Sequence, residues 1–234
     1  MTADLFDNEA PPYHRPDPIA PGAFLLRGLA LQHADALLAA ARDVIASAPL
    51  RHLVTPGGYT MSVAMTNCGD LGWVSDRRGY RYDPCDPVSG QPWPAMPPAF
   101  VDLALHAATQ AGFVHFRPDA CLINRYAPGT RLSLHQDRDE DALEAPIVSV
   151  SLGLPATFLF GGLSRSDKPT RWRLLHGDVV VWGGPSRLAF HGVAPLADGE
   201  HPQLGRQRLN LTFRQVRQTG SAPARTADLG NVSD

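Results

Sequence analysis

Hydrophobic and polar positions are arranged differently in the two halves of the chain. Residues 30–48, ALQHADALLAAARDVIASA, are rich in Ala and Leu and are followed by Pro49, so they predict a helix that stops at the proline. A second helix is predicted over residues 97–112, which begin with prolines and end at Gly112. Between these helices, residues 51–97 are rich in Gly, Pro and aromatic residues and predict only short irregular pieces.

After Gly112 the pattern changes to short apolar or alternating runs that are separated by Gly, Pro and Asp. The runs are CLINRY (121–126), IVSVSLGL (147–154), TFLFGG (157–162), WRLLHGDVVVWGG (172–184) and RLNLTFRQV (208–216). Short runs with turn residues between them are typical of an antiparallel sandwich or barrel. The predicted fold class is therefore mainly β with flanking helices (α+β).

Composition narrows the class of protein without naming a function. The chain has 234 residues and a formal net charge of −2, which gives no sign of a nucleic-acid-binding surface over the whole molecule. The three cysteines lie far apart and form no CxxC motif, which favours a reduced, cytoplasmic protein. The N-terminal residues do not resemble a signal peptide, and no apolar run approaches the roughly 18 residues needed to span a membrane.

The stretch His135-Gln136-Asp137 is the first candidate for chemistry. A histidine beside acidic residues is usually a solvated turn. If SLHQDRDE is extended, however, His135, Asp137 and Asp139 point the same way. With His191 in LAFHGV, two histidines and one carboxylate match the facial triad of non-haem Fe(II) oxygenases. A structural zinc site would usually add sulfur, and no cysteine is placed for that. Because the chain has nine histidines, the triad alone leaves both interpretations open.

The segment RLNLTFR adds a second polar face. On a strand, Arg208, Asn210, Thr212 and Arg214 share one face and the apolar residues share the other. Each guanidinium could form a fork with one carboxylate of a small dicarboxylic acid. Asn124 and Tyr126 also share a face and could add hydrogen bonds to that acid. The alternative is an exposed polar strand, which would more often mix Lys, Glu and Thr.

Together these motifs resemble the AlkB family of Fe(II)/2-oxoglutarate dioxygenases, which demethylate alkylated nucleic acids. The resemblance covers residues 19–217 and includes TPGGYTMSVAMTNCG, GQPWPAMP, NRYAPGTRLSLHQDRDE and HGDVVVWGG. It implies a double-stranded β-helix (jelly-roll) core with an N-terminal nucleotide-recognition lid. It also implies one structural domain that consists of a flexible extension (1–18), helices and lid (19–112), the jelly-roll core (113–217) and a disordered tail (218–234).

The resemblance also implies roles for individual residues. The implied ligands of Fe(2+) are His135, Asp137 and His191. The implied pocket for the cosubstrate 2-oxoglutarate, which reacts together with O₂, is formed by Leu122, Asn124, Tyr126, Arg208, Asn210 and Arg214. The implied substrate contacts are Trp73, Tyr80, Arg81, Tyr82, Asp139 and Arg165. Trp73 would stack on a base that has left the nucleic-acid stack, and Tyr80, Arg81 and Arg77 would hold phosphates.

The implied reaction is oxidative demethylation of bases such as 1-methyladenine and 3-methylcytosine, with release of formaldehyde, succinate and CO₂. The implied substrates are DNA, preferably single-stranded, and RNA, with double-stranded DNA as a further candidate and a monomer as the expected state. Two alternatives remain at this point. One is the same chemistry on a small metabolite or a protein side chain, which would have no use for the lid. The other is a non-catalytic jelly-roll binding module in which HxD…H is degenerate.

Overall fold

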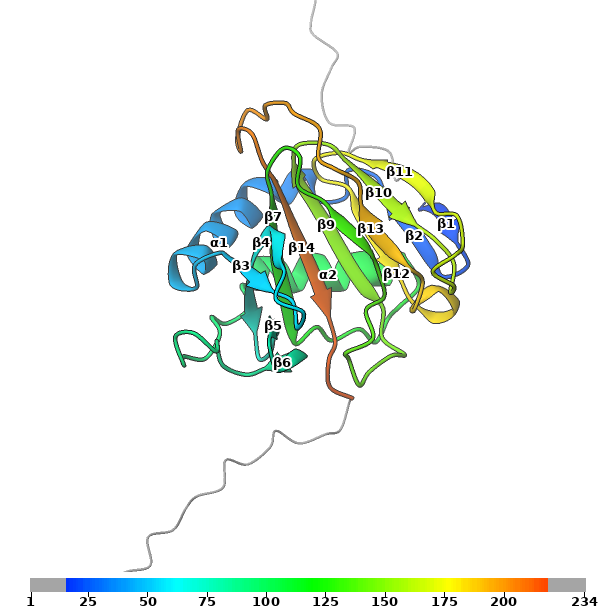
Figure 1. The fold of residues 1–234 in the computed structure, drawn as a ribbon. Helices are drawn as coiled ribbons and strands as arrows, with labels where there is room; N and C mark the ends of the chain where they lie inside the picture. Colours follow the sequence, from blue (N-terminus) through cyan, green and yellow to red (C-terminus); the bar gives the residue numbers. More distant parts are fainter. Residues whose placement is uncertain (1–15, 219–234) are drawn as a thin grey trace, which may run out of the picture.

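Two antiparallel sheets and two helices make up the described part of the chain, residues 16–218 of a computed structural model (Figure 1). The larger sheet contains β1 (Asp17–Ala20), β2 (Ala23–Leu26), β3 (Arg51–Val54), β4 (Thr60–Gly69), β7 (Ala120–Tyr126), β9 (Ile147–Gly153), β12 (Val179–Trp182) and β14 (Arg208–Arg214). The smaller sheet contains β8 (Leu132–His135), β10 (Ala156–Phe160), β11 (Thr170–Leu174) and β13 (His191–Val193). The other elements are the hairpin β5 (Gly72–Asp76) and β6 (Gly79–Asp83), the helices α1 (Ala34–Ser47) and α2 (Pro98–Gln110), and 3-10 turns at Leu31–His33 and Gly184–Ser186.

The path of the chain between the two sheets defines the fold. The larger sheet has the order β1-β2-β12-β9-β14-β7-β4-β3, and the smaller sheet has the order β11-β10-β13-β8. From β7 onward the chain passes repeatedly from one sheet to the other, so that strands far apart in sequence become neighbours. This is the winding of a double-stranded β-helix, and the predicted fold class is confirmed.

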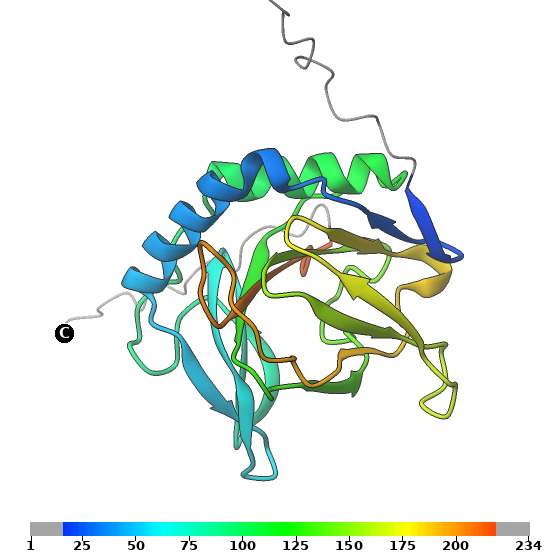
Figure 2. The same ribbon diagram turned by 90° about the horizontal axis from the view of Figure 1, so that it is seen from above.

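Both helices lie on the outer face of the larger sheet, as Figure 2 shows from above. The outward side chains of β14 are Leu209, Leu211 and Phe213, which join the apolar side of the helices in the largest core cluster. Phe100 of α2 contacts Phe213 edge to face, with ring centroids 5.8 Å apart. Within residues 16–218, neither helix has the length and apolar content to cross a membrane.

The inner face of the larger sheet is polar along its middle. One apolar cluster fills the space between the sheets beside β2, β12 and β9, and another fills it beside β7 and β4. Strand β14 lies between these groups in the sheet order, and its inward residues are polar although every residue of the strand is buried. A polar strip is therefore enclosed between two sheets and two apolar clusters.

The structure confirms both predicted helices to within a few residues, but the prediction for residues 51–97 was wrong. This segment contributes β3 and β4 to the larger sheet and also forms the β5–β6 hairpin. Strand β4 has a buried run that includes Thr66, Asn67 and Cys68, so apolar alternation does not mark it as a strand. The predicted flexible extension (1–18) lies mostly outside the described residues, although β1 begins at Asp17. The predicted tail (218–234) also lies outside them except for its first residue.

The contact between α2 and the sheet generates a stability prediction. We expect Phe100→Ala to lower the free energy of unfolding by about 3–5 kcal/mol, because a fully buried ring leaves a cavity that its neighbours cannot fill. Leu105→Ala on the same helix is the control: its side chain is partly exposed, so the loss should stay below about 1 kcal/mol. Urea unfolding followed by circular dichroism measures both, and equal losses would contradict the packing described.

Candidate active site

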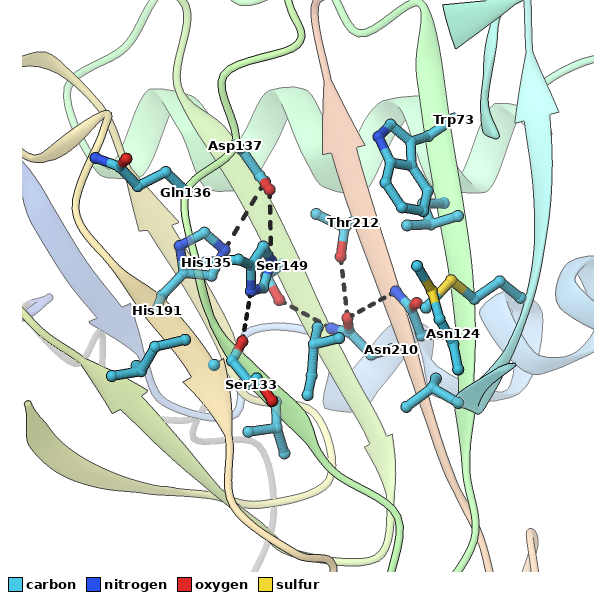
Figure 3. Close-up of a pocket in the computed structure, with 18 of the residues that line it drawn as sticks. Trp73, Asn124, Ser133, His135, Gln136, Asp137, Ser149, His191, Asn210 and Thr212 are labelled. Carbon is cyan, nitrogen blue, oxygen red and sulfur yellow. Dashed lines mark hydrogen bonds and ion pairs between the residues drawn. The ribbon is translucent and has the colours of Figure 1, made fainter. Parts of the chain in front are cut away.

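A cavity of about 920 Å³ lies on the polar strip between the sheets. The inward residues of β7, β9 and β14 line its floor, β8 and β13 line one wall, and Trp73, Tyr80 and Tyr82 of the β5–β6 hairpin line the mouth. Figure 3 shows His135, His191 and Asp137 on one side of this cavity and Asn124, Asn210 and Trp73 on the other. One end of the cavity thus presents the imidazoles of two histidines and a carboxylate. The other end presents side-chain amides and the guanidinium of Arg208.

His135, Asp137 and His191 converge at one point. Strands β8 and β13 are paired so that His135 lies opposite His191. The Nε2 atom of His135 is 3.5 Å from Oδ1 of Asp137, and that of His191 is 3.8 Å from Oδ2. Each Nδ1 faces a main-chain carbonyl, that of Ser133 for His135 and that of Ala189 for His191, so Nδ1–H can donate and leave the Nε2 lone pair free.

The protonation of these groups suits a cation. Burial, and then the neighbouring His135, lowers the pKa of His191 to about 3, so its imidazole is neutral. Burial alone would raise the pKa of the Asp137 carboxyl, but Arg214 and the two histidines together outweigh that effect and hold this pKa below its usual range. Neutral imidazole and carboxylate are the forms in which these side chains bind metal ions. The three donor atoms lie within 4.8 Å of one another and can hold one metal ion.

Side-chain hydrogen bonds join the loop that carries Asp137 to the segment before β13. The assumption that SLHQDRDE is extended holds only to His135, where β8 ends. Beyond it, Arg187 donates to the main-chain carbonyls of Asp137 and Ala145 at 2.7 and 2.9 Å. Gln136 donates to the carbonyl of Leu188 at 2.7 Å. These bonds connect the segments that carry the two histidines, and they place Asp137 although no strand extends that far.

Arg208 gives the other end of the cavity an unbalanced positive charge. It is 1 % exposed, lies opposite Tyr126 in the β14–β7 register, and its Cζ atom is 4.9 Å from the centre of the Tyr126 ring. Its Nη2 donates to Ser151, but Nε and Nη1 have no partner among the described residues. Burial lowers the pKa of Arg208. Because burying an unpaired charge is costly, this geometry is suited to receive a carboxylate.

Hydrogen bonds among polar side chains connect the centre of the strip. Asn210 donates to Ser149 and to the carbonyl of Val150, and its Oδ1 accepts from Thr212 and Asn124. The side-chain amide oxygen (Oδ1) of Asn124 is buried and has no partner in the described chain. Sequence reasoning did not assign Ser149, Ser151 or Thr212 to the site. The signal for the serines was their alternation in IVSVSLG, a strand that is otherwise apolar.

Arg214 lies near the metal-binding end. Its Nε and Nη2 both donate to Oδ2 of Asp137, at 2.9 and 2.7 Å. The predicted picture of two arginines at opposite ends of one dicarboxylate thus has an asymmetry: Arg214 already has an acidic partner, whereas Arg208 has none among residues 16–218. Leu122 lies opposite Thr212 and completes the floor beside Asn124.

The structure brings most of the predicted substrate residues to the cavity mouth. Trp73 and Tyr80 are stacked, with ring centroids 5.5 Å apart and planes 13° from parallel. The indole Nε1 of Trp73 donates to Asp139 at 3.0 Å, and Arg165 also lines the cavity. Arg81 differs, because its guanidinium binds Asp76 and Asp83 within the hairpin. The exposed arginines Arg131 and Arg138 line the mouth as well, and the sequence analysis gave them no role although both lie within NRYAPGTRLSLHQDRDE.

A jelly roll with two histidines and an aspartate on one side, and a buried unpaired arginine on the other, defines the class of 2-oxoglutarate-dependent non-haem iron oxygenases. Comparison with known proteins agrees. The family model for the 2OG-Fe(II) oxygenase superfamily matches residues 22–214. The alpha-ketoglutarate-dependent dioxygenase AlkB of Escherichia coli is 59 % identical over 213 residues, which cover 91 % of this chain and 97 % of that protein.

Two further relatives extend the comparison. The tRNA demethylase abh1 of Schizosaccharomyces pombe is 36 % identical over 144 residues, which cover 56 % of this chain and 47 % of that protein. The solved structure of OsALKBH1 has a TM-score of 0.75 at 30 % identity and covers 86 % of this chain and 99 % of its own. The chain belongs to the AlkB family within the 2OG-Fe(II) oxygenase superfamily. The predicted family, enzyme class and use of Fe(II) and 2-oxoglutarate are confirmed.

Arg208 provides a test of the cosubstrate end. We expect Arg208→Met to weaken 2-oxoglutarate binding by roughly 1.5–3 kcal/mol, since a charge-assisted fork is lost. The ligand-free protein should keep its thermal stability, because the methionine still packs on Tyr126 and a buried unpaired charge is removed. Titration calorimetry and a thermal melt measure the two effects. Arg206→Met, whose arginine side chain is 65 % exposed, is the matched control, and unchanged 2-oxoglutarate affinity in Arg208→Met would contradict the assignment.

Proposed function

We propose that this enzyme repairs N-alkylated bases in nucleic acids by oxidative demethylation. The substrates are bases such as 1-methyladenine and 3-methylcytosine in DNA, preferably single-stranded, and in RNA. The observation that carries the proposal is the aromatic mouth of the cavity, where Trp73 and Tyr80 present flat faces next to the carboxylate of Asp139. The high identity to AlkB and the named activity of the yeast tRNA demethylase support the same substrate class.

The roles of the cavity residues follow from their places. His135, Asp137 and His191 bind Fe(II). Arg208 binds the distal carboxylate of 2-oxoglutarate, with Tyr126 and Asn124 beside it, because it is the guanidinium without an acidic partner among the described residues. Arg214 contacts the carboxylate nearer the iron, because it already lies against Asp137. Asn210 and Leu122 complete the floor between these two ends.

The metal and cosubstrate supply the oxidation: Fe(II) and 2-oxoglutarate activate O₂, and 2-oxoglutarate is converted to succinate and CO₂. One oxygen atom of O₂ enters succinate and the other is inserted into a C–H bond of the N-methyl group. The resulting hemiaminal loses formaldehyde and leaves the unmodified base. The protein must therefore hold the methyl group near His135 and His191, which requires that the base leave the stack.

The mouth of the cavity is suited to a base that has been extruded from a nucleic-acid strand. Stacking of a base on an aromatic side chain contributes about 1–3 kcal/mol, and a cationic methylated base is attracted further to the indole face. Asp139 faces the exocyclic amino group or the positive charge of such a base. Tyr82 is directed inward toward Glu140, so Trp73 and Tyr80 are the aromatic residues that meet the base.

Positive charge around the mouth suits the phosphates next to the extruded base. Arg131, Arg138 and Arg165 are exposed and line the cavity, and none of the three has an ion-pair partner among residues 16–218. A small metabolite would not require these cations or the aromatic mouth, so the arrangement favours a polyanionic substrate. Arg81 acts indirectly, through the hairpin that it braces.

We also propose that the protein acts as a monomer in the cytoplasm.

A panel of matched oligonucleotides tests the proposed function. Single- and double-stranded DNA and RNA oligomers that carry 1-methyladenine or 3-methylcytosine should release formaldehyde and lose 14 mass units, about the mass of one CH₂ group, only when Fe(II), 2-oxoglutarate and O₂ are all present. The free methylated nucleosides should react far more slowly, because they lack the phosphates that the arginines bind. Equal rates on the nucleosides and the oligomers would favour a metabolite hydroxylase instead.

Asp139 generates a prediction about substrate choice. We expect Asp139→Ala to retain iron and 2-oxoglutarate binding but to lose more kcat/KM on cationic 1-methyladenine and 3-methylcytosine than on neutral 1-methylguanine and 3-methylthymine. The reason is that a carboxylate attracts only the charged lesions directly. Asp139→Asn is the matched variant, because its amide oxygen can still accept from Trp73 while the charge is gone. If Asp139→Ala loses activity equally on all four lesions while Asp139→Asn keeps it, Asp139 positions Trp73 and does not read charge.

A further inference from the structure

Glu140 lies at the centre of a buried network that the assigned roles do not use. Its Oε1 atom accepts a hydrogen bond from the hydroxyl of Tyr82 and lies 3.4 Å from Nε of Arg214. Its Oε2 atom accepts from Nη2 of Arg187 at 3.0 Å. The Glu140 residue is 5 % exposed, so this carboxylate is held by groups from the hairpin, from β14 and from the segment before β13.

This network offers Arg214 a second acidic partner. Arg214 lies against Oδ2 of Asp137, the same oxygen that is nearest to His191. When Asp137 binds a metal ion, part of its negative charge is neutralised, and the attraction between Asp137 and Arg214 weakens. Glu140 is then the remaining carboxylate within salt-bridge distance of Arg214 among the described residues. Arg214 is a long side chain whose ordering costs conformational entropy, so an anchor that survives metal binding keeps it in place.

The charges around Arg214 balance in a way that supports this. Asp137 and Glu140 carry two negative charges, and Arg187 and Arg214 carry two positive charges. A divalent metal ion and the cosubstrate carboxylate beside Arg214 would add one net positive charge to this set, because the other carboxylate is proposed to pair with Arg208. Without Glu140 the enclosed group would contain a further uncompensated cation, which is costly to bury unless it is paired.

We propose that Glu140 is a positioning residue for 2-oxoglutarate, which holds Arg214 in its binding orientation, and that the Tyr82 hydroxyl in turn fixes Glu140. Burial raises the pKa of the Tyr82 phenol well above its ordinary value, so the hydroxyl remains a donor. Tyr82 was predicted to meet the substrate, but in this arrangement it connects the hairpin to the cosubstrate end of the site. The inference rests on the proposed contact between Arg214 and 2-oxoglutarate.

Direct binding measurements without oxidation test this inference. The Mn(II)-loaded protein is titrated with 2-oxoglutarate by calorimetry, with no oligonucleotide present. We expect Glu140→Gln to raise the Kd for 2-oxoglutarate about tenfold and Tyr82→Phe to raise it a few fold, as expected for residues that act through another side chain. Removing a negative charge would by itself favour binding of a dianion. Weaker binding by Glu140→Gln therefore means that orientation outweighs charge.

A double-mutant cycle and a loop control make the result specific. If the two residues act in series, Tyr82→Phe should have little further effect in the Glu140→Gln background. Glu144→Gln, an exposed glutamate in the same loop, should leave the Kd unchanged. In turnover, Glu140→Gln should raise KM for 2-oxoglutarate much more than it lowers kcat. Thermal melts of all variants identify any loss of folding, and Tyr82→Phe keeps the test informative if Glu140→Gln unfolds.

Unchanged or tighter 2-oxoglutarate binding in folded Glu140→Gln would overturn the proposal. A loss of oligonucleotide affinity with normal 2-oxoglutarate affinity would also overturn it, and would assign Glu140 to the substrate side. The outcome is separate from that of the proposed function. Repair of methylated oligomers is measured on the unmodified enzyme, whereas the 2-oxoglutarate Kd is measured with no nucleic acid present.

Discussion

Burial of polar side chains on β14 is the constraint on which the rest of the site depends. All seven residues of this strand are buried, with apolar groups under the helices and polar groups toward the smaller sheet. A buried polar group is costly unless it is hydrogen-bonded or paired, so each inward residue needs a partner. Asn210 has partners on β9 and β7, Thr212 donates to Asn210, Arg214 pairs with Asp137, and only part of Arg208 is satisfied. The unsatisfied group marks where a ligand carboxylate belongs.

This constraint also explains how much could be predicted from the sequence. The period of two in RLNLTFR predicts both the strand and its polar face without any structure. The HxD…H pattern alone left a metal site open, because the chain has nine histidines, and the pairing of β13 with β8 is what brings His191 beside His135. Strand β4 was missed because its buried run is continuous, shows no alternation and includes the polar residues Thr66 and Asn67. Glu140 and Arg187 were not assigned either, because their contacts join residues 47 positions apart and no local spacing indicates them.

The substrate and the chemistry depend on separate parts of the molecule. The strip between the two sheets carries the candidate metal ligands and the proposed cosubstrate pocket, and ladders of main-chain hydrogen bonds hold its strands in place. The β5–β6 hairpin and the loops with exposed arginines lie outside both sheets and carry the proposed substrate contacts. Sites on loops can change without disturbing a core, which is why one jelly roll serves many substrates. Substrate class therefore has to be argued from the hairpin and loops rather than from the triad.

Asp137 connects these two parts through charge. The same carboxylate lies between two histidines and Arg214, with Oδ1 facing His135 and Oδ2 accepting from Arg214, so a metal ion bound to it would compete with the arginine for its negative charge. A ligand carboxylate beside Arg214 would replace the negative charge of Asp137 that the metal ion takes up. Metal and cosubstrate binding should therefore favour each other. Glu140 limits how far Arg214 moves while this exchange occurs, and Tyr82 extends the connection to the hairpin beside Trp73. Arg214, Glu140 and Tyr82 thus form a continuous series of contacts from the metal-binding end of the cavity to the hairpin that carries Trp73, which is proposed to stack on the base.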